Sequence, residues 1–376
     1  MIEVRDVRSR ADLRAFVAFP ERLYAGHPQY VPKLVGDELK TLDPRRNPAF
    51  DYCDAKLWMA WRDGQPVGRV AGIVSHRANE TWRQKRARFG WLDLVDDREI
   101  AAALLGTVEG WAAGRGLEAV HGPLGFCDLD REGMLVEGFD ELDMLITNYN
   151  FPYYPVHLEG LGYHREVDWV EYLVSVPSAM PANVERLSRV VLDRSRLRLV
   201  TTRRRRDLIP WVSGVFGLIN DSYKDLYAVV ALSPRQIEYY TRTFFGLLDH
   251  ELVKIVVDRH DRVAAFGIAM PSLSRALQRC RGRLFPLGFV SVLRALRRND
   301  RLDLLLTGVR PDIQNKGVNA VLINEVWKVA SRRGIRVAET GPELETNDKI
   351  QSQWKHFDSR QHRRRRCYLK MLASAG

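Results

Sequence analysis

The sequence predicts an α/β protein made of two copies of one strand–helix–strand unit, and three observations lead to this prediction. The 376 residues are enough for two domains with separate cores. Short apolar or alternating runs, typical of strands, are interleaved with amphipathic helices in both halves. The run LLGTVEGWAAGRGLEAVHGP at 104–123 matches LINEVWKVASRRGIRVAETGP at 322–342, with helix, glycine and strand in step. Chance similarity between two amphipathic helices is the alternative explanation.

The first half contains a hairpin, a strand–helix–strand segment and a mixed segment before a boundary. We predict strands at 56–63, 66–74, 87–95 and 117–125, a helix at 97–116, and a short helix with two strands within 148–176. Asp63 and Gly64 form the hairpin turn, and Gly116 is expected to cap the helix. The stretch SVPSAMPANVERL is rich in proline and small residues, so we predict domains at 1–176 and 177–376.

The second half repeats this order. We predict a hairpin at 251–270 with its turn at 259–261, strands at 302–309, 335–344 and 365–372, and helices at 319–334 and 347–357. An insert at about 273–299 replaces the usual short turn between two of these strands. Its leucines recur every three or four residues with arginines between them, which indicates a basic amphipathic segment. Such a segment contacts an anionic lipid surface, or it is a helical hairpin packed over the fold.

The composition is that of a globular protein, with 45% hydrophobic and 28% charged residues. We find neither a secretory signal pattern nor a run of 18 apolar residues, and the four cysteines lack metal-ligand spacing. We therefore expect a cytoplasmic, reduced protein without a metal. The net charge of +11 favours anionic partners such as nucleotide cofactors, nucleic acid or an anionic membrane face.

The stretch GVRPDIQNKGVNAVLI, residues 308–323, joins a predicted strand to a predicted helix. The first N–H groups of a helix lack partners inside the helix and attract phosphate. Gly317 allows a ligand to approach the backbone, while Lys316 and Arg310 add positive charge nearby. These features predict an anion site, and an ordinary loop is the alternative.

This arrangement resembles the GNAT superfamily of acyl-CoA N-acyltransferases. Gln314 and Gly317 match the family's Arg/Gln-x-x-Gly-x-Gly/Ala loop, Asn319 replaces its second small residue, and Asn347 matches an asparagine that contacts the cofactor. The resemblance implies two GNAT-like mixed-sheet domains in tandem and acyl-CoA as co-substrate. The implied cofactor-binding residues are Val309, Gln314, Asn315, Lys316, Gly317, Val318, Asn319, Ala320 and Asn347. In the first copy, Asp96 and Asp97 stand where phosphate would bind, so we expect no cofactor there.

Acyl transfer to an amine needs a group that accepts the amine proton. Glu339, Glu343 and Glu345 are the candidates, and we favour Glu339 because it stands near the end of a strand where the family opens its cleft. The family often protonates the leaving thiolate with a tyrosine, where this chain has Trp354. Either Tyr368 or His356 acts as the acid, and of the two we favour Tyr368, or the thiolate leaves without an acid.

Aromatic and amide side chains gather in the segment NYNFPYYP. This mixture suits an acceptor pocket, or it is a packed turn. The predicted substrate-binding residues are Asn148, Tyr149, Asn150, Tyr153 and Tyr154. Arginine runs at 203–206 and 360–367 attract phosphate in general, but no nucleic-acid-binding motif accompanies them, and the second run could serve CoA phosphates.

The sequence therefore predicts transfer of an acyl group from acyl-CoA to an amine. The whole chain also resembles bacterial N-acyltransferases of sphingoid-type lipid amines, which form ceramides, so a lipid amine is the expected acceptor. With the basic insert, this implies peripheral contact with an anionic membrane, on the inner face. One alternative is an acetyltransferase acting on a small polar amine or a peptide. Another is a non-catalytic module that binds acyl-CoA or a membrane.

Overall fold

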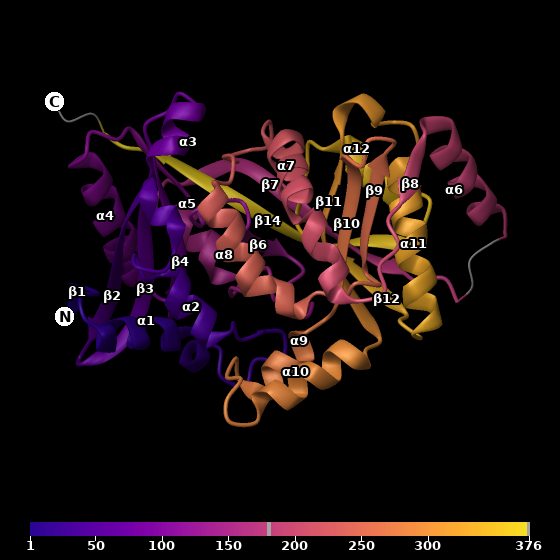
Figure 1. The fold of residues 1–376 in the computed structure, drawn as a ribbon. Helices are drawn as coiled ribbons and strands as arrows, with labels where there is room; N and C mark the ends of the chain where they lie inside the picture. The colour runs from indigo at the N-terminus through magenta and orange to yellow at the C-terminus, as the bar shows by residue number, and fades with distance from the viewer. Residues whose placement is uncertain (179–181, 374–376) are drawn as a thin grey trace.

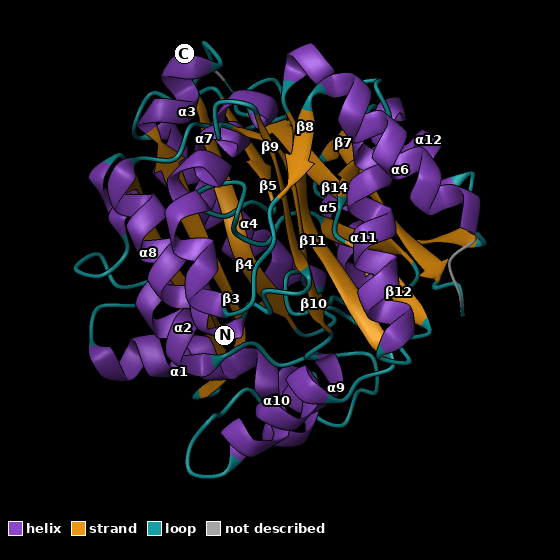
Figure 2. Ribbon diagram, turned by 45° about the vertical axis from the view of Figure 1, so that its right-hand side comes forward, coloured by secondary structure: helices purple, strands orange, loops and turns teal. Residues whose placement is uncertain are grey.

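The computed structural model describes residues 1–178 and 182–373 of the chain. In this part of the chain, fourteen strands join in one mixed sheet, with helices on both of its faces (Figures 1 and 2). Twelve strands form a continuous path in the order β1-β2-β3-β4-β5-β14-β7-β12-β11-β10-β9-β8, while β6 pairs with β14 and β13 pairs with β7. Among these residues, we find no helix with both the length and the apolar character to span a bilayer.

The first half contributes one side of the sheet. Its strands are β1 (Ile2–Asp6), β2 (Cys53–Arg62), β3 (Gln65–Ser75), β4 (Arg86–Leu94), β5 (Ala119–Gly122), β6 (Met134–Glu137) and β7 (His164–Ser175). Its helices are α1 (Arg10–Leu23), α2 (Val35–Thr41), α3 (His76–Thr81), α4 (Arg98–Ala113) and α5 (Tyr153–Gly160). The predicted hairpin is β2–β3. Residues 148–176 form α5 and a single strand, β7, instead of the helix and two strands that we expected.

The second half contributes the other side. Its strands are β8 (Leu197–Leu199), β9 (Val253–Asp258), β10 (Val263–Pro271), β11 (Arg301–Val309), β12 (Val337–Thr340), β13 (Glu343–Leu344) and β14 (Ser359–Met371). Its helices are α6 (Ala182–Ser195), α7 (Val212–Tyr223), α8 (Pro234–Phe244), α9 (Ser274–Cys280), α10 (Gly288–Arg297), α11 (Val318–Arg332) and α12 (Asp348–Trp354). Short 3₁₀ turns cover Pro48–Asp51, Arg205–Trp211, Phe245–Leu247 and Pro311–Ile313.

The repeat predicted from the sequence corresponds to β4–α4–β5 and β11–α11–β12. In both copies the helix links two parallel strands, and the first strand uses only its first residues for this pairing: Arg86–Arg88 of β4 and Arg301–Leu304 of β11. Each helix is followed by a glycine with positive φ, Gly116 at 70° and Gly334 at 72°. We expected Gly116 to cap α4, but the C-cap of this helix is Gly114, two residues earlier.

The two halves exchange their last strands. β14, at the end of the second half, pairs antiparallel with β5 of the first half and with β7. β7, at the end of the first half, pairs on its other edge with β12 of the second half. In Figure 1 the yellow strand β14 crosses the centre of the molecule. The predicted boundary after residue 176 therefore divides the chain, but it does not divide the sheet.

Candidate acyl-transfer site

The parallel strands β11 and β12 separate part of the way along β11. β12 pairs with Arg301–Leu304 only, whereas β11 continues to Val309. The backbone N–H of Gly341 donates to the Leu304 carbonyl at 2.9 Å, at the point where the strands part. Beyond this point β11 remains paired with β10, but its edge facing β12 has no strand partner among the described residues, and the Thr307 carbonyl accepts from the Tyr223 O–H at 2.8 Å. Such an edge can hydrogen-bond an extended ligand.

An apolar cavity of about 360 Å³ lies over this opening. Its walls come from α7, α8, β10, β11, α11 and α12, with a loop of the first half on one side. The apolar side chains around it include Val215, Phe216, Ile219, Leu304, Leu306, Val326, Trp327 and Trp354. Polar groups are few, and they include Asn319 and Asn347, both predicted as cofactor-binding residues. An apolar cavity with a few placed polar groups is typical of a small-molecule site.

The helix α11 begins next to this cavity without a capping side chain. Its N-cap is Gly317, with φ at 80°, and Asn315 also has a positive φ of 63°. The N–H groups of the first turn therefore keep their capacity for an anion. Lys316 is exposed, whereas Arg310 is occupied by Asp258 and Asp312.

The other predicted loop residues divide into two groups. Val309 and Val318 are buried in one apolar cluster, so they hold the loop against the sheet. The Gln314 side chain donates to the Val309 carbonyl at 3.2 Å and folds the loop back on β11. Asn319 lines the cavity, and its Oδ1 is buried without a donor in the described chain, while Ala320 is exposed. Asn319 thus has an acceptor that is free for a ligand.

The matching place in the first half is filled by the protein itself. Asp97 caps α4 by accepting from the N–H of Glu99 at 2.8 Å, and its other oxygen pairs with Arg62 at 2.7 Å. The chain after β5 enters the space beside β4, so a Cβ on Gly90 would lie 2.5 Å from the Leu124 carbonyl oxygen. The first half therefore lacks both the uncapped helix and the open strand edge.

Known proteins share this architecture over nearly the whole chain. A solved tandem GNAT protein from the clavulanic acid biosynthesis pathway covers all of both chains, with a TM-score of 0.59 and 12% identity. The chain has the tandem GNAT fold. A GCN5-related N-acetyltransferase from Sphaerobacter thermophilus covers 99% of this chain and 96% of its own, with a TM-score of 0.50 and 12% identity.

Sequence comparison finds two relatives and no matching protein-family model. Protein YghO of Escherichia coli (strain K12) is 26% identical over 378 residues, which cover 98% of this chain and 95% of that protein. The bacterial ceramide synthase of Caulobacter vibrioides (strain NA1000 / CB15N) is 24% identical over 296 residues, covering 78% of this chain and 76% of that protein.

Within the C-terminal GNAT unit, a buried carboxyl faces the cavity from β13. Glu343 lines the cavity, and the indole N–H of Trp354 donates to its oxygens at 3.0 and 3.1 Å. Burial raises the pKa of Glu343 to about 8. Trp354 stands where the family often has a tyrosine, and here it positions this carboxyl. A carboxyl with such a pKa can exchange a proton near neutral pH.

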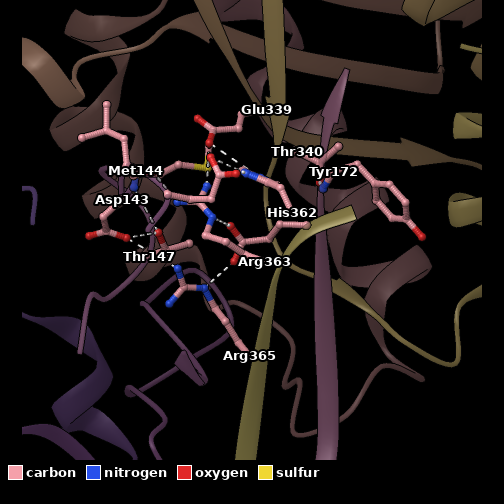
Figure 3. A network of polar contacts seen from close by, with 12 residues as sticks. Asp143, Met144, Thr147, Tyr172, Glu339, Thr340, His362, Arg363 and Arg365 are labelled. Atoms are coloured by element: carbon pink, nitrogen blue, oxygen red, sulfur yellow. Dashed lines mark hydrogen bonds and ion pairs between the residues drawn. The ribbon is translucent and has the colours of Figure 1, made fainter. Parts of the chain in front are cut away.

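Glu339, the proton acceptor favoured from the sequence, lies elsewhere. It is 2% exposed on β12 and pairs with Arg363 of β14 at 2.8 Å, beside His362 (Figure 3). It is not among the residues that line the cavity. The reason is the exchanged strand β14, which places Arg363 against this carboxyl. Glu345 also points away, because it pairs with Arg165 and Arg364.

Tyr368, the favoured catalytic acid, is not brought to the cavity either. It lies on β14 opposite Gly122 of β5 and is fully buried in the core of the first half. Its O–H donates to Glu159 at 3.0 Å. The strand exchange again explains the difference, because β14 completes the sheet of the other GNAT unit.

The arginine run before Tyr368 is also structural. Arg363 and Arg365 are fully buried and share the carboxylate of Glu171, whereas Arg364 and Arg366 pair with Asp168. These four side chains are therefore engaged by acids of the protein, and the hypothesis that this run serves CoA phosphates is not supported by their contacts.

Most of the predicted acceptor residues surround a second cavity of about 130 Å³. Asn148, Tyr149, Asn150 and Tyr154 line it, while Tyr153 does not. Tyr153 donates to the Leu94 carbonyl at 2.7 Å, and the amide of Asn150 bonds both backbone groups of Leu135, so these two have structural contacts. Leu129, Asp130, Ile146, Tyr240 and Phe244 line both cavities, which therefore share a wall.

Sequence reasoning missed two carboxyls on the first-half side of the main cavity. Asp128 and Glu132 both line it. Burial raises the pKa of Asp128 to about 6, and burial together with the charge of Asp128 raises the pKa of Glu132 well above its usual range. The acidic run DLDRE, which begins six residues after the end of β5, is the signal that could have identified them. Within residues 1–178 and 182–373, no cluster of three metal-ligating side chains occurs.

Proposed function

We propose that this protein is an N-acyltransferase that moves an acyl group from acyl-CoA to an amine. One observation carries the proposal: in the second half, the parting of β11 and β12, the uncapped start of α11 and an apolar cavity meet at one place. The first half has the same topology, but Asp97 and the chain around Leu124 occupy the corresponding positions. A site kept open in only one of two copies is expected if that copy binds a ligand.

The residues of the second half fit acyl-CoA. The N–H groups of residues 317–320 suit its pyrophosphate, with Lys316 nearby, and the free edge of β11 suits its extended arm. Asn319 and Asn347 offer amide groups inside the cavity. Bound acyl-CoA supplies a thioester carbonyl, and transfer forms a C–N bond to the amine while the C–S bond breaks.

In this proposal Glu343 replaces Glu339 as the proton acceptor. The ionised carboxylate takes the proton that the amine nitrogen loses, and Trp354 holds the carboxylate in place. The apolar lining of the cavity offers few groups that could hold water, which favours aminolysis over hydrolysis. Both reactants are held in one enclosure, so positioning contributes much of the rate.

We propose an amine with an aliphatic body as the acceptor. The apolar lining of the cavity supports this choice, and the similarity to a bacterial ceramide synthase points the same way. Asp128 and Glu132 suit the cationic head of such an amine from the first-half side. Asn148 and Tyr149, in the adjoining cavity, would contact its polar groups.

Release of free thiol tests this function directly. The purified protein is mixed with acetyl-, octanoyl- or palmitoyl-CoA and with either a long-chain amino alcohol or a short polar amine. We expect amine-dependent thiol release, fastest with the long-chain amino alcohol. Turnover with the short amine alone would favour an acetyltransferase for polar amines, and binding of acyl-CoA without turnover would indicate a non-catalytic module.

A further inference from the structure

The insert predicted at 273–299 forms a helical hairpin, α9–α10, at the edge of the molecule (Figure 1, bottom). One face of this hairpin is packed. Leu273, Ala276, Leu277, Val292 and Ala295 are buried against an apolar cluster that includes Val31, Leu34, Leu145 and Met270. The hypothesis of a packed cover is therefore correct for this face.

The opposite face of the hairpin is apolar and exposed. We call it the outer face and define it as Phe285, Leu287, Phe289, Val290 and Leu293. Phe285 is 82% exposed and Leu287 is 73% exposed, and both lie in the connection between the two helices. These five side chains are a large share of the exposed large apolar groups in the described chain, yet they come from only nine residues. Isolated apolar residues on a surface are ordinary, but such a group indicates contact with another body.

The segment that carries the outer face is rich in positive charge. The segment 273–299 contains seven arginines and neither aspartate nor glutamate. Arg283 pairs with Glu21 at 2.9 Å, and Arg275 lies 3.6 Å from Asp300. Among the described residues, the other five have no acidic partner; they are Arg279, Arg281, Arg294, Arg297 and Arg298. All five are exposed, so their charges are available to a partner.

We propose that the outer face docks the protein on the surface of an anionic phospholipid bilayer. The aromatic and aliphatic side chains of the hairpin enter the interface, and the five arginines contact lipid phosphates. A second copy of the chain is a poorer occupant, because it would bring the same arginines against one another. An anionic bilayer offers an apolar interior for the exposed side chains and negative charge for the arginines that have no acidic partner in the described chain.

Docking here also brings the bilayer near the proposed site. The packed cluster of the hairpin includes Leu305, and Leu305 lines the main cavity. The cavity thus adjoins the packed face of the hairpin, and the outer face lies on the other side of the same hairpin. The docking proposal itself rests only on the hairpin and holds whether or not the cavity performs acyl transfer.

Vesicle flotation with the full chain tests the proposal. We expect the wild-type protein to float at low salt with vesicles of equal parts phosphatidylglycerol and phosphatidylcholine, and to float poorly with phosphatidylcholine alone. Added salt should reduce binding, because the attraction is screened. Replacing Arg294, Arg297 and Arg298 with Gln should weaken binding to the anionic vesicles by about a hundredfold.

The apolar contribution needs its own variant and a matched control. The double variant Phe285→Ser and Leu287→Ser should weaken binding by about tenfold or more, because both side chains lose their burial in the interface. Val156→Ser is the control, since Val156 is exposed on α5 far from the hairpin in sequence, and it should bind as the wild type does. Circular dichroism should show that all variants remain folded.

Three results would overturn the proposal. The first is a wild-type protein that stays unbound with anionic vesicles at low salt, and the second is hairpin variants that bind as tightly as the wild type. The third is a concentration-dependent dimer that is lost in the Phe285→Ser, Leu287→Ser variant while vesicles remain unbound. That third result would assign the outer face to self-association.

Discussion

Glu343 and Trp354 form a pair whose chemistry depends on pH. The carboxyl lies in an apolar wall, which raises its pKa to about 8, so only a fraction is ionised at neutral pH. If the ionised form accepts the amine proton, kcat/KM should rise about tenfold per pH unit below pH 8 and then level off. The Glu343→Gln variant should lose this step and about a hundredfold of kcat/KM at pH 8.

The control for this prediction is Glu345→Gln, two residues along the chain. Glu345 pairs with Arg165 and Arg364 outside the cavity, so this variant should keep the wild-type pH profile. The measurement is thiol release across pH 6 to 10 for all three proteins. A Glu343→Gln variant with the wild-type profile would assign proton transfer to water or to another group.

Asp303 leads to a prediction about stability. It is fully buried on β11, and neither carboxyl oxygen has a hydrogen-bond partner in the described chain. Burial and the neighbouring Glu339 raise its pKa to about 8, whereas the unfolded chain releases this proton near pH 4. Between these values the folded state binds more protons, so this residue makes the protein less stable as pH rises.

Asp303→Asn removes that dependence, because asparagine does not ionise. From pH 5 to pH 7, the variant should gain about 1 kcal/mol per pH unit relative to wild type in urea-unfolding free energy. Asp300→Asn, at an exposed position just before the same strand, should show no such trend. A constant difference between Asp303→Asn and wild type would mean that Asp303 is already ionised in the folded protein.

The sequence could not predict which of Glu339, Glu343 and Glu345 faces the cavity. The run ETGPELETN contains three carboxyls at and just after the end of β12. Which of them faces the cavity depends on Arg363, which neutralises Glu339 from a strand of the exchanged pair. The contact between Arg363 and Glu339 depends on the order of the strands in the sheet, which no local sequence pattern predicts.

At the scale of elements, a substitution at the start of α11 tests whether this loop is an anion site or an ordinary loop. Gly317→Asp places a carboxylate at the uncapped first turn, where it would repel pyrophosphate. We expect the affinity for CoA, measured by titration calorimetry, to fall by about tenfold or more. Gly334→Asp is the control, because Gly334 follows the same helix, has a φ of 72° and lies in open space.

Both substitutions place a side chain at positive φ and should cost about 1–2 kcal/mol of stability. Only Gly317→Asp should change CoA binding. Equal affinity in the two variants would show that the α11 loop is structural.

Local patterns account for much of the element list. The hairpins β2–β3 and β9–β10 have turns and apolar runs that identify them, and both repeated helices were found from their periodicity. Helices α1 and α8 were not predicted, although Ser9 and Ser233 form capping boxes that mark their starts. The strand exchange could not be predicted, because β7 and β14 have the same local character in either arrangement.

At the scale of the whole molecule, a buried ionic network joins the exchanged strands. Arg365 of β14, labelled in Figure 3, is fully buried. It pairs with Glu171 of β7 and also donates to the Asn148 carbonyl. Removing this guanidinium takes one of two cationic partners from the buried Glu171 carboxylate, which then keeps Arg363 alone, and it leaves the Asn148 carbonyl without this donor. Arg365→Ala should therefore reduce the free energy of unfolding in urea by about 3–5 kcal/mol.

Arg360→Ala is the matched control on the same strand. Arg360 is largely exposed and pairs with Glu141 at the surface, so its loss should cost at most about 1 kcal/mol. Both proteins should unfold in one transition, because the two halves share a continuous sheet. Similar losses for the two variants would show that the buried network adds little to stability.

The position of β14 between β5 and β7 has a consequence for synthesis. A ribosome completes β1 to β7 long before it reaches residues 359–371. The nascent first half then has all of its own strands but lacks β14, which lies between β5 and β7 in the finished sheet. Until β14 emerges, β5 and β7 present open edges that can pair with other chains. The first half should thus remain protease-sensitive on stalled ribosomes, and its maturation should await release of the last strand.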